Sequence, residues 1–102
     1  METLSSVTRS KVLEILKTVK PELERKYHVA EIGLFGSFVR GEEQRASDVD
    51  ILVEFSRPVG MFKFLELEEY LERKIGKKVD LVSRKALKPY IGRRILNEVI
   101  ML

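Results

Sequence analysis

Two aspartates spaced two residues apart, Asp48 and Asp50, are the side chains of this sequence best suited to chemistry. They border or lie in the apolar, β-branched segment Val49–Phe55, which predicts a strand. Because side chains at positions i and i+2 of a strand emerge on the same face, the two carboxylates are expected close together. Two such charges need a cation, and carboxylate oxygens suit a hard divalent ion such as Mg²⁺. Mg²⁺ usually completes its shell with waters and substrate phosphates, so the expected co-ligand is a phosphate.

A phosphate site is predicted just upstream, at Gly36 and Ser37. The preceding segment Val29–Phe35 predicts a buried strand, and residues 36–41 allow one or two helical turns between glycines. Glycine lets the backbone approach a ligand closely, and a serine at the start of a short helix offers N–H groups and a hydroxyl. This order of strand, turn and helix indicates an anion cradle.

Asp80 is the third candidate carboxylate, placed inside an otherwise apolar strand expected over Val79–Val82. Buried there without a partner, an acidic side chain would be strongly destabilising. If this strand neighbours the one over Val49–Phe55, Asp80 joins Asp48 and Asp50. Three carboxylates around two metal ions suffice for an in-line nucleotidyl transfer, in which one ion activates the attacking hydroxyl and the other holds the triphosphate.

Each motif also has a plainer explanation. Asp-x-Asp is common at solvated strand ends, most glycine–serine pairs are ordinary turns, and Asp80 can form a structural ion pair with Lys77, Lys78 or Arg84. A calcium-binding EF-hand loop is disfavoured, because the residues after Asp48 make a strand rather than a loop. The combination of the three motifs in this order, each at the end of a strand, favours the catalytic interpretation.

The remaining elements must position these residues. A helix is expected over Val7–Leu23, with N-caps available at Ser5, Ser6 or Thr8. Pro21 predicts a kink or a break near Lys20, after which a short helix can restart. Further helices are expected from Phe62 to a stop at Gly76 and from Pro89 to about Glu98. The alternation predicts an α/β (α+β) fold with one small sheet.

Length and composition limit the function further. The chain has 102 residues, enough for a single domain, taken as 1–102, and too few for separate cofactor and substrate domains. A net charge of +3, without aromatic residues among the basic ones, argues against nucleic acid as a partner. The absence of cysteine excludes thiolate chemistry and favours a cytoplasmic location. Neither a membrane span nor an export signal is expected.

The segments Leu34–Gly41, Ser47–Val53 and Val79–Val82 together resemble the minimal nucleotidyltransferases of the DNA polymerase β superfamily, of the MntA-like antitoxin type. The spacing is Gly-Ser, ten residues, then Asp-x-Asp. The resemblance implies a polymerase β palm, a small mixed sheet with helices on one side, and transfer of a nucleoside monophosphate, usually from ATP with two Mg²⁺ ions. It implies that Gly36 and Ser37 hold the triphosphate, that Asp48 and Asp50 bind both metals, and that Asp80 binds the catalytic metal and helps deprotonate the acceptor.

Arg40 matches an arginine common in this family's Gly-Ser helix. Its functional interpretation is a phosphate contact, and its structural one is an ion pair with Glu42 or Glu43.

Stand-alone members of this size are, by resemblance, often antitoxins that act on a HEPN-domain ribonuclease toxin. We expect transfer of AMP to a hydroxyl of that partner, in particular a tyrosine. The alternatives are neutralisation of the toxin by binding alone and, as a weaker hypothesis, modification of a small molecule.

Apolar residues also extend round more of the helix after Gly60 than one buried stripe needs. We interpret the excess as a partner or dimer interface, giving a hetero-oligomer or homo-oligomer. The residues concerned are Phe62, Phe64, Leu65, Leu67 and Tyr70, together with Val99 to Leu102.

Overall fold

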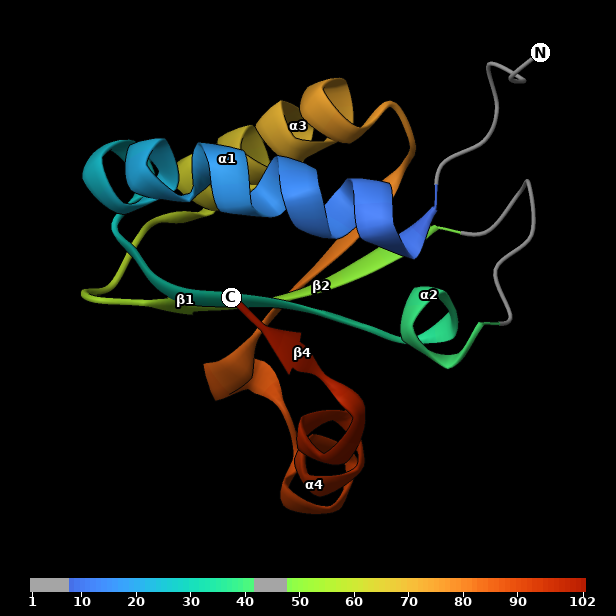
Figure 1. Cartoon of the computed structure of the whole chain (residues 1–102). Helices are drawn as coiled ribbons and strands as arrows, with labels where there is room; N and C mark the ends of the chain where they lie inside the picture. Colours follow the sequence, from blue (N-terminus) through green and yellow to red (C-terminus); the bar gives the residue numbers. More distant parts are fainter. Residues whose placement is uncertain (1–7, 42–47) are drawn as a thin grey trace, which may run out of the picture.

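The computed structural model describes residues 8–41 and 48–102, which form a four-stranded sheet with helices packed against it (Figure 1). The strands are β1 (Val29–Phe35), β2 (Val49–Phe55), β3 (Val79–Ser83) and β4 (Ile100–Met101). The helices are α1 (Arg9–Tyr27), α2 (Ser37–Arg40), α3 (Met61–Ile75) and α4 (Pro89–Glu98), with a 3-10 turn, η1, at Arg84–Ala86.

The sheet is mixed, as the family resemblance implies. Its strand order is β3-β2-β1-β4, with β2 parallel to β3 and antiparallel to β1, and with β4 antiparallel to β1. The two long helices α1 and α3 lie on the same face of the sheet, as the resemblance implies, whereas α4 lies on the other side, next to β4, and departs from the expectation of helices on one side (Figure 1). No helix within residues 8–41 and 48–102 is long and apolar enough to cross a membrane.

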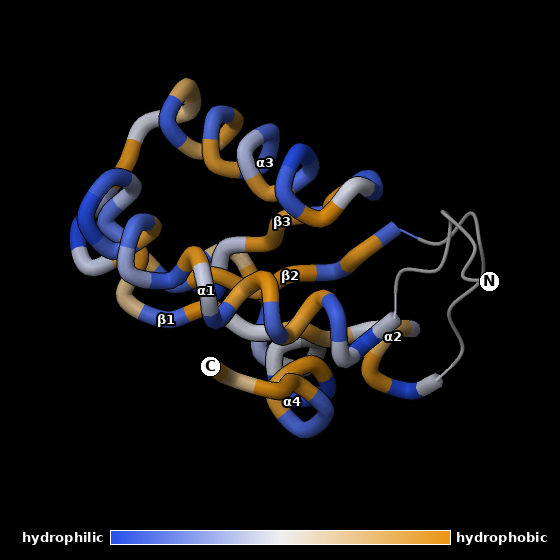
Figure 2. The backbone as a smooth tube through the Cα atoms, turned by 45° about the horizontal axis from the view of Figure 1, so that its top comes forward, coloured by the Kyte–Doolittle hydropathy of each residue, from blue (hydrophilic) through white to orange (hydrophobic). Residues whose placement is uncertain are grey.

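The alternation of side chains along β2 separates the core from the site. Val49, Ile51 and Val53 are fully buried in the core beneath the two long helices. Asp48 and Asp50 therefore belong to the opposite face, the one on which α4 lies. β3 follows the same pattern, with Val79 and Leu81 in the core and Asp80 on the other face. Figure 2 shows β2 as mostly apolar, with polar residues interrupting the run.

The first helix contradicts one prediction: α1 runs through Pro21 as a single helix, so the break expected near Lys20 is wrong. Pro21 is exposed, so water can bind the backbone carbonyl that the proline leaves without a partner. Val19 and Leu23, on either side of it, are buried in the core and hold the helix in place. Thr8 is the N-cap, since its hydroxyl accepts the Lys11 N–H at 3.2 Å. Ser5, Ser6 and Val7 lie outside the described residues.

The edge strand β3 is held by α3 as well as by β2. Glu72 accepts the Val79 N–H at 3.0 Å, and Glu68 accepts the Leu81 N–H at 3.1 Å. These two bonds flank Asp80 and occupy backbone donors that an edge strand leaves without a ladder partner. They therefore help to fix the position of Asp80 along the strand direction.

At the opposite edge, Val99 to Leu102 do not join the apolar surface of α3 that the sequence suggests. They supply β4, in which Met101 pairs with Gly33 and Ile100 with Leu34. A Cβ added to Gly33 would lie 2.9 Å from the backbone oxygen of Ile100, so this close approach of the two strands favours glycine.

Candidate active site

Asp50 and Asp80 are direct partners across the parallel strands β2 and β3. Asp48 lies two residues before Asp50, directly before the start of β2, and is expected on the same face. The expectation that β3 neighbours β2 is confirmed, and the topology brings the three predicted carboxylates to one end of the sheet. Asp48 and Asp80 are exposed to solvent, while Asp50 is half-buried.

The charges of these residues act on one another. The pKa of Asp50 rises from 3.8 to about 6, first because burial disfavours its charged form and then because Asp80 and Asp48 repel its charge. Arg40 opposes the rise, and Glu98 adds weakly to it. The Asp50 carboxylate is thus poorly compensated by the protein alone, so a cation at this place would be strongly favoured.

The donor set fits Mg²⁺ bound together with a nucleotide. All the candidate ligands are carboxylate oxygens, which a hard divalent cation prefers. Among the described residues no three acidic, histidine or cysteine side chains already converge as a metal-binding group. Mg²⁺ needs only one or two carboxylates when phosphates and waters complete its octahedron. The arrangement suits an ion that arrives with its substrate rather than a permanent structural metal.

Gly36 lies directly against Asp50. Its φ of +80° and ψ of −151° fall in a region that is almost restricted to glycine. A Cβ at this position would lie 2.1 Å from the Asp50 Oδ2, far inside van der Waals contact. Both the backbone conformation and the close approach of the carboxylate therefore require glycine. Gly36 of the predicted phosphate site and Asp50 of the predicted metal site are therefore neighbours in the structure.

Ser37 begins the short helix α2 and is partly exposed. The Val39 and Arg40 N–H groups both donate to the Gly36 carbonyl, at 3.0 and 3.1 Å, which closes the turn after β1. The Arg9 guanidinium of α1 donates to the Val39 carbonyl at 3.0 Å and ties α2 to the long helix. Gly36 thus lies against Asp50, and Ser37 follows it in the chain as the first residue of α2.

Glu98, at the end of α4, is a member of this site that the sequence did not indicate. The Gly36 N–H donates to its Oε2 at 2.8 Å, and the Arg40 Nη1 lies 3.1 Å from both of its oxygens. The alternative partners considered for Arg40, Glu42 and Glu43, lie outside the described residues. No local motif could have revealed Glu98, because 62 residues separate it from Gly36.

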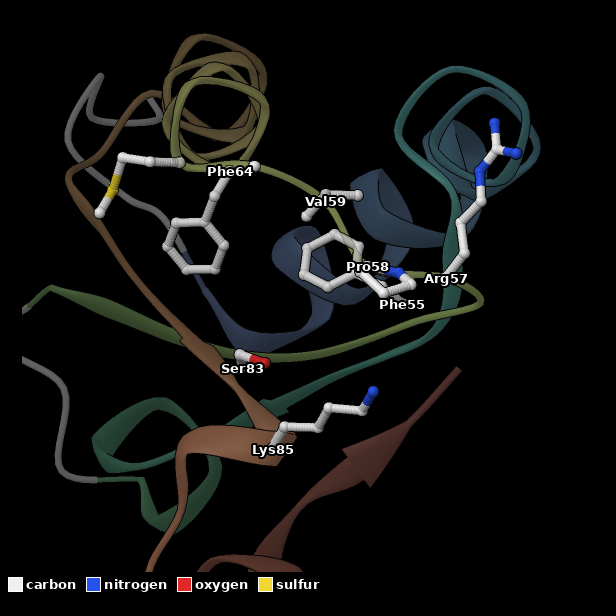
Figure 3. Close-up of a pocket in the computed structure, with 9 residues that line it drawn as sticks. Phe55, Arg57, Pro58, Val59, Phe64, Ser83 and Lys85 are labelled. Carbon is white, nitrogen blue, oxygen red and sulfur yellow. The ribbon is translucent and has the colours of Figure 1, made fainter.

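A hollow of about 450 Å³ lies at the ends of β2 and β3 that are remote from the carboxylates (Figure 3). Phe55 and Phe64 form its apolar part, with their ring centroids 6.2 Å apart. It is separate from the carboxylates, because Phe55 and Asp50 stand at opposite ends of β2. Its lining residues are Phe55, Arg57, Pro58, Val59, Gly60, Met61, Phe64, Ser83 and Lys85.

The structure divides the apolar residues of α3 that the sequence assigned to an interface. Leu67 and Tyr70 are buried in the core, whereas Phe62 is 84% exposed and Leu65 48% exposed. Met61, which the sequence did not single out, is 70% exposed beside them. An interface at this exposed part of α3 stays a prediction.

Residues 16–102 match the family model described as the nucleotidyltransferase domain. The protein adenylyltransferase MntA of Thermococcus cleftensis is 46% identical over 97 residues, which cover 95% of this chain and 98% of that protein.

Solved structures give the same result for the fold. A candidate minimal nucleotidyltransferase superposes with a TM-score of 0.80 at 29% identity, over 91% of this chain and 94% of that one. A toxin–antitoxin complex with AMP-PNP matches with a TM-score of 0.67 at 24% identity, over 91% and 70% of the two chains. A complex of a tri-AMPylated Shewanella oneidensis HEPN toxin with its MNT antitoxin matches with a TM-score of 0.59 at 19% identity, over 96% and 71%. At these identities the two complexes establish the shared fold.

The family model covers most of the chain, and the relative from Thermococcus cleftensis is similar along nearly its whole length. The chain belongs to the nucleotidyltransferase-domain family and is a nucleotidyltransferase enzyme.

Proposed function

We propose that this enzyme transfers AMP from ATP to a hydroxyl of a partner protein and that it requires Mg²⁺. The observation that carries the proposal is the alignment of Asp50 with Asp80 on neighbouring strands, with Asp48 beside them and Gly36 against Asp50. Protein adenylyltransferase is also the name of the relative that shares 46% of its residues with this chain.

Each residue has a role in this proposal. Asp48, Asp50 and Asp80 would hold Mg²⁺, which when bound neutralises phosphate charge and lowers the pKa of the attacking hydroxyl. Gly36, Ser37 and Arg40 bind the triphosphate. The acceptor oxygen forms a bond to the α-phosphorus while the bond to the β-phosphate oxygen breaks, and pyrophosphate leaves. Asp80 takes the proton of the acceptor hydroxyl.

We propose a HEPN-domain toxin as the partner protein and a tyrosine as the acceptor, so that this chain acts as an antitoxin. One of the structural neighbours contains an AMPylated HEPN toxin together with its antitoxin, which supports this choice of partner. A cytoplasmic location is part of the same proposal and draws on the cysteine-free composition.

The test is the intact mass of the protein encoded beside this one, which the proposal expects to be a HEPN toxin, after incubation with ATP and Mg²⁺. Wild type should add AMP groups, and the double variant Asp48→Asn, Asp50→Asn should add none. The double variant Glu66→Gln, Glu69→Gln removes two negative charges from exposed positions of α3 and should behave as wild type. Protection from the toxin by both wild type and the aspartate variant, with no mass change for either, would establish neutralisation by binding alone.

A further inference from the structure

The Glu98 carboxylate occupies donors that the proposed function assigns to the nucleotide. Its Oε2 accepts the Gly36 N–H at 2.8 Å, and both of its oxygens lie 3.1 Å from the Arg40 Nη1. The Glu98 side chain is 22% exposed and the Arg40 side chain 42%, and the bond from Gly36 to Glu98 is partly buried. An acidic side chain from the far end of the chain thus sits at the glycine turn.

Carboxylate and phosphate can use the same donors of such a turn. Both are oxyanions that accept from backbone N–H groups and from guanidinium groups, with short charge-assisted hydrogen bonds. A backbone N–H has a single hydrogen to donate, so Gly36 can serve either Glu98 or a phosphate oxygen at full strength. Arg40 is likewise drawn toward whichever anion is present.

The negative charge around this turn also opposes binding of a nucleotide. Asp48, Asp50 and Asp80 already place three carboxylates near this turn, and Glu98 is a fourth negative charge acting on Asp50. An incoming triphosphate therefore meets the repulsion of Glu98 as well as its occupation of the two donors. Removing that one charge should help the nucleotide in both respects.

We propose that Glu98 is an internal competitor of the nucleotide: its carboxylate holds Gly36 and Arg40 in the free enzyme, and the triphosphate must displace it to bind. The inference rests on the proposed function for the location of the triphosphate. It goes further in assigning Glu98, which lies outside the family motif, control over nucleotide affinity.

Displacement also has a mechanical side. Glu98 is the last residue of α4, and β4 follows it almost directly. β4 is held by two paired positions on β1 and by the bond from the Leu102 N–H to the Ile32 carbonyl at 3.0 Å. A nucleotide that expels Glu98 therefore loosens the junction between α4 and the edge of the sheet. Hydrogen exchange of the backbone at this junction should therefore depend on whether a nucleotide is bound.

The test measures binding of ATP with Mg²⁺ by isothermal titration, without any partner protein. Glu98→Gln keeps the shape of the side chain and removes its charge, and it should lower the dissociation constant about tenfold, the value of one charge-assisted hydrogen bond. Glu69→Gln removes the same charge from an exposed position and should leave the constant unchanged. Glu98→Ala serves as a second variant. It should also bind ATP more tightly, and that increase in affinity does not depend on how a glutamine side chain packs.

Two further readouts separate competition from a purely structural role. Arg40→Ala should weaken ATP binding more in the Glu98→Gln background than in wild type. In wild type the substitution also removes the Arg40–Glu98 pair that ATP must break, which offsets part of the loss. Hydrogen exchange at residues 100–102 should accelerate when ATP binds wild type, and it should already be fast in Glu98→Gln.

Unchanged or weaker ATP binding by both Glu98 variants, in protein with wild-type secondary structure, would overturn the inference and assign Glu98 to positioning Arg40. That result would leave the proposed function standing. The converse result, tighter ATP binding by the variants with no AMP transfer to any partner, would remove the proposed function and keep Glu98 as the competitor.

Discussion

Asp50 and Asp80 are opposite each other on the parallel strands β2 and β3, and the backbone ladder sets this alignment. Because side chains alternate between the faces of a sheet, a slip of β3 by one residue would turn Asp80 into the core and bring Val79 or Leu81 out of it. The register that buries the core is therefore the register that assembles the site.

Replacing Asp50 by asparagine should stabilise the metal-free protein while abolishing AMP transfer. The pKa of Asp50 is about 6 in the fold and 3.8 without it, so ionisation penalises the native state as the pH rises through this interval. The penalty is absent below the unfolded value and complete above the folded one. Since the carboxylate is only half-buried, we expect a gain of about 1–2 kcal/mol at neutral pH, below the full value of such a shift.

Urea unfolding in EDTA at a series of pH values from 4 to 7 measures this gain in stability. The change is expected between about pH 4 and 6, because these values correspond to the two pKa values. The difference between Asp50→Asn and wild type should be near zero at the acidic end and should grow through the interval. Glu66→Gln, an exposed charge removal on α3, should show no such growth. A variant less stable than wild type at neutral pH would contradict the repulsion that we describe.

Replacing Gly36 by alanine should damage both the fold and the activity. The φ of +80° disfavours a side chain, and the new Cβ would displace the Asp50 carboxylate. We expect a loss of about 1–3 kcal/mol in the free energy of unfolding and little remaining AMP transfer. Gly76→Ala is the matched control, because Gly76 has φ +82° with no atom within 4 Å of its added Cβ. It should lose stability but retain transfer, and equal loss of activity in both variants would refute the role of the Asp50 contact.

Asp80→Asn should separate chemistry from nucleotide binding. Its role in the proposal is to hold the catalytic metal and take the acceptor proton, so AMP transfer should fall by about 10²–10⁴-fold. ATP should still bind, since Asp48, Asp50 and the glycine turn remain. Single-turnover transfer and equilibrium ATP binding, measured on the same preparation, provide the comparison. Parallel losses of both quantities would instead make Asp80 a binding residue.

Tyr70→Phe should destabilise the protein without affecting transfer. The Tyr70 hydroxyl of α3 donates to Glu22 of α1 at 2.8 Å, and its loss should cost about 1–2 kcal/mol. Burial, followed by this hydrogen bond, raises the pKa of Tyr70 from 10.0 to about 12. The bond should thus stabilise the fold fully below pH 10 and lose its effect as the pH rises through 12.

Absorbance of tyrosinate during alkaline titration and thermal unfolding at several pH values test the role of Tyr70. Glu22→Gln keeps an acceptor without the charge and should lose less stability than Tyr70→Phe. A titration in which Tyr70 ionises at the ordinary tyrosine value of 10.0 would show that the bond is not formed.

Much of the fold was predictable because strongly apolar segments bounded by glycine define its elements. The bounds of β1, β2 and α4 agree with expectation, and Gly76 ends α3 as its position suggests. The break at Pro21 was wrong because a local rule was applied where packing decides: the core holds α1 on both sides of an exposed proline. The strand β4 was missed, although Gly33 in the middle of β1 is a sign of close backbone approach.

The candidate site was likewise predictable from the sequence only in part. Asp48, Asp50 and Gly36 belong to local motifs whose spacing carries chemical meaning, and the strand pattern suggested Asp80. Glu98 could not be found in this way, because its contact with Gly36 depends on how α4 returns to the sheet. Spacing along a sequence reveals groups on one element, whereas a contact over 62 residues is a product of the whole topology.

The glutamates of α3 that bind the outer backbone of β3 also restrict how this protein can assemble. Glu68 and Glu72 occupy the N–H groups through which a strand from another chain would extend the sheet. The other edge, β4, has only two residues to offer. Within the described residues, these contacts oppose β-augmentation at the β3 edge and leave only a short strand at β4, which favours recognition of a partner through side chains. Substitutions on the surface could then change the choice of partner while the sheet that carries the carboxylates stays as it is.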